Sequence, residues 1–261
     1  MILRPFAGRL RRRINLLIDH REDDECQSIT KAYSFAGKYK RIYTYHVRKT
    51  GGTSLNKMFL ALSGTDSNKL YEELIHARCH RQIVGDKVYV GWNKLLIERG
   101  HYFYAYSHIP SHELALPENT YTITCLRDPI KRLVSHYKML VEAAEEDSPP
   151  AWFHHEKKWL GRSVMDFAES LPPEHLLRQL YMFSPHLNVD VGVSEIKKCN
   201  LYFRTEEFDR GIARLNASID LNLSPMKVRS TNVQVELSSK MLKTLKRMLA
   251  PEYELMGKLG L

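Results

Sequence analysis

Two segments about eighty residues apart share one pattern, a strand-like run that leads into a helix through a short polar turn, and this pattern constrains the fold most. Residues 45–55 read Tyr-His-Val-Arg-Lys-Thr-Gly-Gly-Thr-Ser-Leu, and residues 125–137 read Cys-Leu-Arg-Asp-Pro-Ile-Lys-Arg-Leu-Val-Ser-His-Tyr. Strands that alternate with helices are typical of an α/β fold, in which helices flank a central parallel sheet on both faces.

Further strand patterns support the same fold class. β-Branched and aromatic residues predict strands at 41–47, 102–106, 120–126 and 200–204. In a parallel sheet, the loops that bind ligands gather at the carboxyl ends of the strands. Both polar turns follow predicted strands, so we expect them at one edge of the sheet.

Helices are predicted where apolar residues recur at spacings of three and four. This spacing follows both polar turns and the strand at 200–204, and it recurs at 68–76 and 236–249. Prolines divide the stretch 151–198 into short predicted helices. The helix after Asp128 has a predicted inward face made of Ile130, Leu133, Val134, Tyr137, Val141 and Ala144.

Length and charge bound the domain organisation and the ligand. The chain has 261 residues, 43% of them hydrophobic, and a net charge of +9. This length suits one large domain or two small ones, and the positive charge favours an anionic ligand. We predict one domain at 36–261, after a basic N-terminal extension at 1–35. Charge alone leaves nucleic acid, a nucleotide and an acidic glycan open as ligands.

The extension and the cysteines bear on localisation. Arginines mix with a few apolar residues at 4–18, a stretch too short to span a bilayer and without a signal-peptide cleavage pattern. We favour a solvated leader helix, and a peripheral membrane contact through this basic segment is the alternative. The cysteines at 26, 79, 125 and 199 form no CxxC motif, which predicts reduced thiols and a cytoplasmic protein.

The first polar turn carries groups that bind a phosphate. Its two glycines let backbone N–H groups approach an anion, at the positive end of the following helix. Lys49 adds a full charge, and Thr50, Thr53 and Ser54 add hydroxyl donors. Because the lysine precedes the glycines, the turn is not the GxxxxGK[ST] loop of ATPases, and no residue is placed to hold Mg²⁺ as that loop does. We therefore predict no metal requirement.

These residues resemble the 5′-phosphosulfate-binding loop of sulfotransferases, in the family that includes heparan sulfate 2-O- and 6-O-sulfotransferases and many bacterial relatives. That loop commonly reads His-Ile-Pro-Lys-Thr-Gly-Gly-Thr-Ser, and residues 46–54 match it except at two positions, where Val47 replaces isoleucine and Arg48 replaces proline. The resemblance implies a P-loop-like sulfotransferase architecture and the sulfate donor 3′-phosphoadenosine 5′-phosphosulfate (PAPS). It also implies that the cofactor is bound by Arg48, Lys49, Thr50, Gly51, Gly52, Thr53 and Ser54.

The second polar turn resembles the same family. Arg127 follows a strand, and Ser135 lies two helical turns further on, so that both can face one groove. A guanidinium and a hydroxyl suit a phosphate, and the resemblance implies that this pair binds the 3′-phosphate of the cofactor. Asp128 is interpreted as a helix cap, and Lys131 and Arg132 as a solvated face.

Sulfuryl transfer to a hydroxyl needs a base for the acceptor proton and positive charge near the leaving phosphate. By the resemblance, Lys49 supplies that charge. His108 follows directly on the strand at 102–106, where relatives carry their catalytic histidine, and we predict it as the base. His112 is the second choice and a candidate contact to the acceptor. His46 is interpreted as a core histidine with a satisfied hydrogen bond.

A basic stretch at 227–232 precedes the last predicted helices. Relatives close a late loop of this kind over the cofactor, which makes Arg229 and Thr231 candidates for contact with its phosphate. A basic surface loop is the alternative. The resemblance covers about residues 40–257 and is densest at the two polar turns.

The leading hypothesis is an enzyme that moves a sulfuryl group from PAPS to a hydroxyl of a carbohydrate-like acceptor, a glycan or glycolipid. The product of the donor would be adenosine 3′,5′-bisphosphate (PAP). We predict no nucleic-acid partner, because the sequence has no recognisable motif for one. The alternatives are a nucleotide kinase of the same architecture, a non-catalytic basic protein that binds nucleic acid, and a sulfotransferase relative that binds the donor without reacting.

Overall fold

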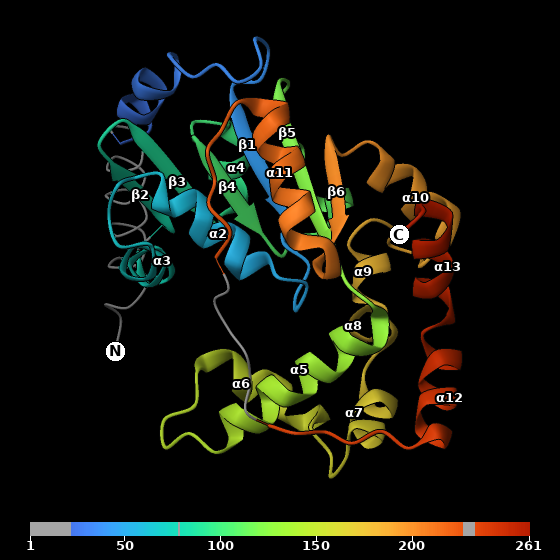
Figure 1. Ribbon diagram of the computed structural model, residues 1–261. Helices are drawn as coiled ribbons and strands as arrows, with labels where there is room; N and C mark the ends of the chain where they lie inside the picture. Colours follow the sequence, from blue (N-terminus) through green and yellow to red (C-terminus); the bar gives the residue numbers. More distant parts are fainter. Residues whose placement is uncertain (1–21, 78, 227–232) are drawn as a thin grey trace, which may run out of the picture.

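A single sheet forms the centre of the protein (Figure 1). In the residues that the computed structural model describes, 22–77, 79–226 and 233–261, this sheet has six strands in the order β2-β3-β4-β1-β5-β6. Neighbouring strands are parallel except β2 and β3. The strands are β1 (Arg41–Tyr45), β2 (Arg81–Val84), β3 (Lys87–Gly91), β4 (Tyr104–Ser107), β5 (Thr120–Leu126) and β6 (Leu201–Arg204).

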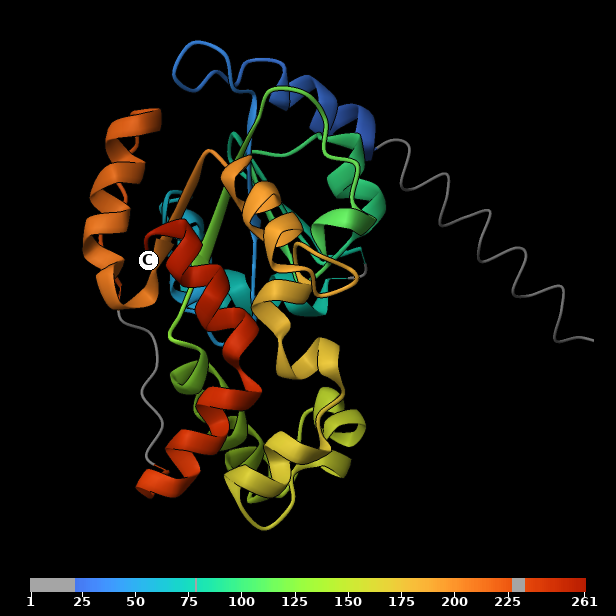
Figure 2. The same ribbon diagram turned by 90° about the vertical axis from the view of Figure 1, so that its right-hand side faces the viewer.

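Helices cover both faces of the sheet, as the two ribbon views show (Figures 1 and 2). One face carries α2 (Gly52–Ala61), α3 (Ser67–His76) and α11 (Phe208–Ile219), and the other carries α4 (Lys94–Arg99), α10 (Val189–Lys197) and α13 (Ala250–Leu259). In β1, Ile42 packs into the first layer, whereas Tyr43 and Tyr45 pack into the second. The α/β fold predicted from the sequence, a central parallel sheet flanked by helices, is confirmed.

A second group of helices lies beyond the carboxyl ends of the strands (Figure 1). It comprises α5 (Pro129–Ala144), α6 (Ala151–Glu156), α7 (Val164–Ser170), α8 (Pro173–Leu176), α9 (Arg178–Tyr181) and α12 (Ser239–Met248). Short 3-10 helices are η1 (Ser111–Glu113), η2 (Lys157–Trp159) and η3 (Thr205–Glu207). Leu133, Phe167 and Leu245 from this group belong to the same buried cluster as Tyr43 of the sheet. The helical group and the sheet therefore share one core.

The start of α5 agrees with the prediction. The Asp128 side chain accepts the backbone N–H of Lys131 at 2.9 Å, and Pro129 is the first helical residue. A carboxylate here satisfies a backbone donor that the first turn of a helix leaves open. The predicted role of Asp128 as a helix cap is confirmed.

The inward face of α5 differs from the predicted one. Ile130 and Leu133 are buried as expected, but Arg132 and His136 are buried as well. The predicted inward residues Val134, Tyr137 and Val141 are only half-buried, and Ala144 is exposed. The prediction that Arg132 lies on a solvated face is wrong, because its side chain has a buried carboxylate partner that apolar periodicity does not reveal.

Residues 22–30 form a helix that packs on the domain, with Cys26 in its core. Asp23 of this helix pairs with Arg81 of β2 at 3.2 Å and with Arg99 of α4 at 3.1 Å. The boundary predicted between 1–35 and 36–261 stays a prediction. The basic segment for which we weighed a membrane contact lies outside the described residues.

Within residues 22–77, 79–226 and 233–261, no helix is long and apolar enough to cross a bilayer.

Candidate active site

Three strand ends meet at one edge of the sheet. β1 lies between β4 and β5, and Tyr45 is in register with Ser107 of β4 and with Thr124 of β5. Because the three strands are parallel, the turns that follow them leave from the same edge. The sheet therefore brings together both polar turns and the segment that begins with His108.

The turn after β1 has a backbone that suits an anion. Gly51 has a φ of 86°, which favours glycine, and a Cβ atom at Gly52 would lie only 2.0 Å from Cδ2 of His46. Lys49 also has a positive φ, 69°, a conformation that strains a residue other than glycine. No side chain caps α2, and its first turn contains no acidic residue. The N–H groups and partial positive charge of α2 thus face the turn.

The hydroxyl groups of this turn have different surroundings. Thr50 is buried, and its hydroxyl donates to the carbonyl oxygen of Val47 at 2.9 Å. The hydroxyl proton of Thr50 is therefore used within the turn, in a bond that stabilises the turn. Thr53 and Ser54 are half-buried in the first turn of α2, where a hydroxyl can supplement the N–H groups of the helix.

The second polar turn lies against the first. The guanidinium of Arg127 donates to the carbonyl oxygen of Lys49 at 3.1 Å. Thr205, which follows β6, also joins the turns, because its hydroxyl lies 2.6 Å from the carbonyl oxygen of Thr50 and 3.0 Å from that of Leu126. The two turns form one site, and no motif in the sequence identified Thr205 as part of it.

His108 follows β4 with its ring held in one orientation. Its Nδ1 lies 2.6 Å from the carbonyl oxygen of His46, to which it donates, so that Nε2 is left as a proton acceptor. Burial, together with the charges of Arg48 and Arg178, lowers the pKa of His108 to about 4, although the bond to His46 opposes them. The ring is therefore neutral at pH 7.

His46 lies beneath the first turn, as the core histidine that the sequence predicted. It is buried, and its Nδ1 accepts from the side-chain amide of Asn56 at 3.2 Å. Burial holds the pKa of His46 well below its usual value. Its ring centroid is 4.4 Å from that of His108, so it supports the ring predicted to be the base.

His112 is connected to His108 through two neighbouring side chains, those of Tyr181 and Arg178. Its ring packs edge-on against Tyr181, with the centroids 5.5 Å apart. The guanidinium of Arg178 lies 5.6 Å from the Tyr181 ring centroid and donates to the carbonyl oxygen of His108 at 2.8 Å. Arg178 lies in the region of short helices, where no motif predicted it.

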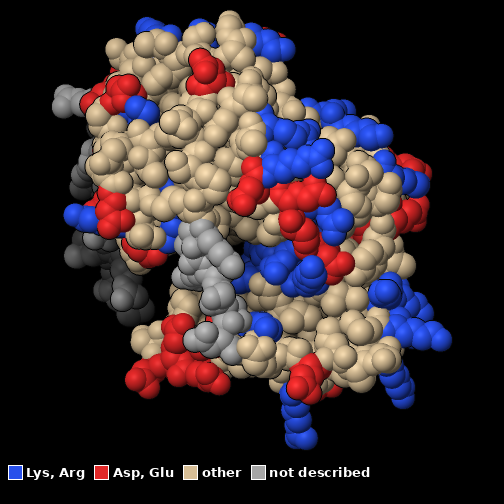
Figure 3. All heavy atoms as spheres, viewed as in Figure 1, with Lys and Arg blue, Asp and Glu red and all other residues tan. Residues whose placement is uncertain are grey.

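A buried arginine, Arg132, and a half-buried one, Arg178, lie near this edge of the sheet. Burial lowers the pKa of Arg132 and Arg178, and the charge of Arg48 lowers both further. In the part of the chain that the structure describes, Nε of Arg178 and Nη1 of Arg132 have no hydrogen-bond partner. Figure 3 shows Lys and Arg side chains gathered at a recess between the sheet and the helical group. Like charges so close together suit an anionic ligand.

Glu156 joins the first turn to α5. Its carboxylate accepts from Arg48 and, at 2.8 Å, from Nε2 of His136. Burial raises the pKa of Glu156, but the bond from His136 and the charge of Arg48 outweigh it and lower this pKa to about 2. Burial lowers the pKa of His136 to about 4, so the histidine is neutral. Ser135, half-buried, precedes it directly on α5.

Two predicted contacts fall beyond the structural description. Arg229 and Thr231 lie outside the described residues.

In the described ranges, no group of three or more His, Cys, Asp or Glu side chains has an arrangement that suits a metal ion.

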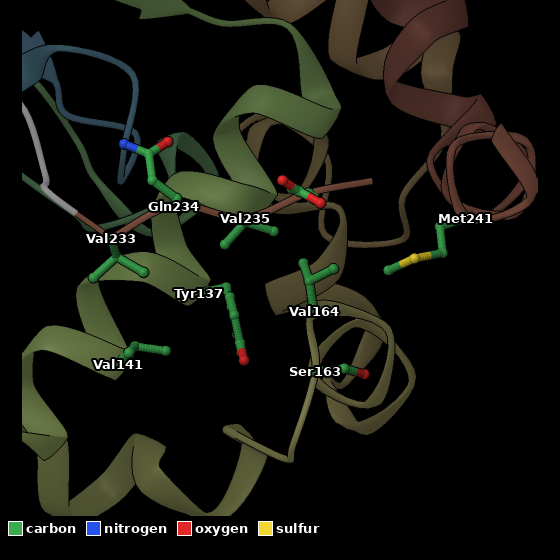
Figure 4. Close-up of a pocket in the computed structure, with 9 residues that line it drawn as sticks. Tyr137, Val141, Ser163, Val164, Val233, Gln234, Val235 and Met241 are labelled. Carbon is green, nitrogen blue, oxygen red and sulfur yellow. The ribbon is translucent and has the colours of Figure 1, made fainter. Parts of the chain in front are cut away.

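A separate hollow of about 320 Å³ lies between α5, α7 and α12 (Figure 4). Apolar side chains dominate its lining, among them Tyr137, Val141, Val164 and Met241. None of the residues predicted to bind the donor or the acceptor lines it. The hollow is therefore distinct from the site at the sheet edge.

The fold and the paired turns define an α/β protein with two turns suited to an anion at the carboxyl edge of its mostly parallel sheet. Residues 31–174, more than half of the chain, match the model of the sulfotransferase family. The chain belongs to this family, whose general donor is PAPS, and is an enzyme that transfers sulfate. The search of curated proteins found no match. Both turns, His108 and Ser135 fall within the matched residues.

Proposed function

We propose that the protein transfers the sulfuryl group of PAPS to a hydroxyl of a carbohydrate-like acceptor, a glycan or a glycolipid. The observation that carries this proposal is the 3.1 Å hydrogen bond from the Arg127 guanidinium to the Lys49 carbonyl. It unites two anion-binding turns in one site. A nucleotide with phosphate groups on its 5′ and 3′ sides needs two such turns, whereas a nucleotide phosphorylated at one end would occupy only one.

In this proposal the first turn holds the 5′-phosphosulfate. Lys49, the N–H groups that follow Gly51, and the hydroxyls of Thr53 and Ser54 contact its oxygens, because α2 starts there without a capping side chain. Arg127 and Ser135 hold the 3′-phosphate. Arg48 contributes by holding the turn, because its guanidinium is paired with Glu156.

His108 is the proposed base. Its Nε2 takes the proton of the acceptor hydroxyl while the acceptor oxygen bonds to sulfur and the bond from sulfur to the phosphate oxygen breaks. Lys49 stabilises the charge that the leaving phosphate gains. An anionic donor beside His108 raises its pKa from about 4 in the free enzyme, towards the range in which a base is effective. His112 is the proposed contact to the acceptor.

Different observations support the proposed acceptor class, the proposed cellular compartment and the preference for a sulfotransferase over the alternatives. The carbohydrate-like acceptor follows from the resemblance to glycan sulfotransferases, and the cytoplasmic setting is inferred from four cysteines that form no CxxC motif. The kinase alternative is disfavoured by the order of lysine and glycines in the first turn. Family membership favours an enzyme over a nucleic-acid-binding protein.

Ligand binding tests the proposed donor. By isothermal titration calorimetry, PAP should bind at least about tenfold more tightly than adenosine 5′-phosphate, because a charged hydrogen bond to the 3′-phosphate is worth about 1.5–3 kcal/mol. Arg127→Ala should remove that preference. Equal affinities for the two nucleotides in the wild-type protein, or tighter binding of ATP, would contradict the proposal.

Turnover tests the proposed chemistry. Labelled sulfate from PAPS should appear on members of a panel of glycans, glycolipids and small alcohols. His108→Ala should lower this turnover by at least about a hundredfold and leave the affinity for PAP unchanged. His154→Ala, at an exposed position, is the matched control. Turnover that survives in His108→Ala would refute the assignment of the base.

A further inference from the structure

The main chain of Arg127 is held by a side chain from another helix. The N–H of Arg127 donates to Oε1 of Gln179 at 2.8 Å, and Nε2 of Gln179 donates to the carbonyl oxygen of Arg127 at 3.0 Å. The amide of Gln179 thus bonds to Arg127 as the main chain of a neighbouring strand would. Fixing both groups sets the direction in which the Cα–Cβ bond of Arg127, and with it the start of the side chain, leaves the main chain.

Glu252 holds Gln179 in turn. One oxygen of its carboxylate accepts the backbone N–H of Gln179 at 2.7 Å, and the other accepts from Nε2 of Gln179 at 3.0 Å. The two Nε2 protons of Gln179 are therefore used, one by Arg127 and one by Glu252. The reverse orientation of the amide would place its oxygen against both acceptors, so only one orientation is satisfied.

The network is closed to solvent. Gln179, Glu252 and Arg132 are each 0% exposed, and Nε of Arg132 lies 3.7 Å from the Glu252 carboxylate. Without competing water, a lost hydrogen bond leaves a buried polar group unsatisfied. Small shifts in this network therefore cost free energy, so the main chain of Arg127 is held rigidly.

We propose that Gln179 and Glu252 are positioning residues that aim Arg127 at the 3′-phosphate of the donor. This inference rests on the proposed function. Both residues lie outside the matched range 31–174, on α9 and α13. The carboxyl-terminal helix thereby takes part in donor recognition through the main chain of Arg127.

Isothermal titration calorimetry with two nucleotides separates positioning from general stability. PAP carries the 3′-phosphate and adenosine 5′-phosphate lacks it. In Glu252→Gln and Gln179→Met, the affinity for PAP should fall about tenfold, the value of one misaligned charged hydrogen bond. The affinity for adenosine 5′-phosphate should stay the same. Glu254→Gln, at an exposed position on the same helix, should change neither.

A double-mutant comparison makes the test sharper. In an Arg127→Ala background, Gln179→Met should have no further effect on the ratio of the two affinities, because the group that it aims is gone. The inference is overturned if the ratio of the two affinities is unchanged in folded single variants, whether neither affinity falls or both fall equally. If the wild-type protein itself does not prefer PAP, the proposed function fails first. Gln179→Met keeps the test available if Glu252→Gln does not fold.

Discussion

Arg48 is the residue at which the first turn makes a contact that the usual proline of the resembled loop could not make. Its guanidinium pairs with Glu156, and the two side chains are 20% and 9% exposed. A carboxylate this deeply buried depends on its partners, because the loss of one leaves a charge in a poorly solvating environment. The pair therefore couples the turn to α6.

Arg48→Met should lower the free energy of unfolding by about 2–4 kcal/mol, because Glu156 keeps its charge without its cationic partner. Adding Glu156→Gln should recover part of this loss. Urea denaturation at pH 7 measures both, and Lys258→Met, which breaks exposed pairs, should cost less than about 1 kcal/mol. Simple additivity of Arg48→Met and Glu156→Gln would contradict the coupling.

His136 should make stability depend on pH. Its pKa falls from 6.5 to about 4 in the folded protein, so the unfolded chain binds more protons between these values. Its contribution is complete above pH 6.5 and is lost as the pH falls towards 4, with a slope of at most about 1.4 kcal/mol per pH unit. Urea denaturation from pH 7 to pH 5 should show a smaller slope in His136→Gln.

Glu156 does not contribute to the pH dependence measured in the same series. The pKa of Glu156 is lowered to about 2 from 4.5, so its contribution is lost only below pH 4.5, outside the measured interval. His154→Gln replaces an exposed histidine and should leave the slope unchanged. A slope that His136→Gln does not reduce would show that this histidine does not titrate as described.

His108 should set the acid limb of the rate profile. Since its pKa in the free protein is lowered to about 4, kcat/KM should stay level from pH 8 to pH 6 and fall only below about pH 5. Initial rates across this range, with folding checked by circular dichroism at each pH, measure the limb. A limb near pH 6.5 would indicate that a histidine with an ordinary pKa is the base.

At the scale of elements, the turn before α2 is the most constrained connection. Gly52→Ala would force a Cβ atom to within 2.0 Å of the His46 ring, so the turn must shift. We expect a loss of about 1–3 kcal/mol in stability and at least about a tenfold loss of PAP affinity. Thermal unfolding and calorimetry measure the two effects.

Gly257→Ala is the matched control for this substitution. It lies inside α13, and a Cβ atom there would have open space within 4 Å, so alanine should stabilise the helix by about 0.5–1 kcal/mol. It should leave PAP affinity unchanged. Equal effects of the two substitutions would mean that the close approach of His46 to Gly52 does not constrain the turn.

Elements governed by local chemistry agree with the sequence predictions. The strand at 120–126 is β5, and Asp128 caps the next helix. The hairpin of β2 and β3 was not predicted, although β3 is as long as β1 and β2 is as long as β4. The inward face of α5 was misjudged because Arg132 and His136 are buried through partners distant in the sequence.

At the scale of the whole molecule, the shared core predicts one unfolding transition. Tyr43 of the sheet and Phe167 of the helical group belong to one cluster, so the helical group shares its core with one face of the sheet. Trp92 reports on the sheet, and Trp152 and Trp159 report on the helical group. In Trp92→Phe, fluorescence should give the same urea midpoint as far-ultraviolet circular dichroism. Separate midpoints would mean that the two parts unfold independently.

The α/β class, the two polar turns and their order could be predicted from the order of the residues, because strands, caps and glycine turns depend on neighbouring residues. The sequence also placed Lys49, His108 and Arg127 at strand ends, and strand order then put these ends on one edge. The distant groups that hold them, such as Gln179 behind Arg127 and Glu156 beside Arg48, are known only from the folded protein. Such partners are selected by burial, where a polar group must find a hydrogen bond whatever its distance along the chain.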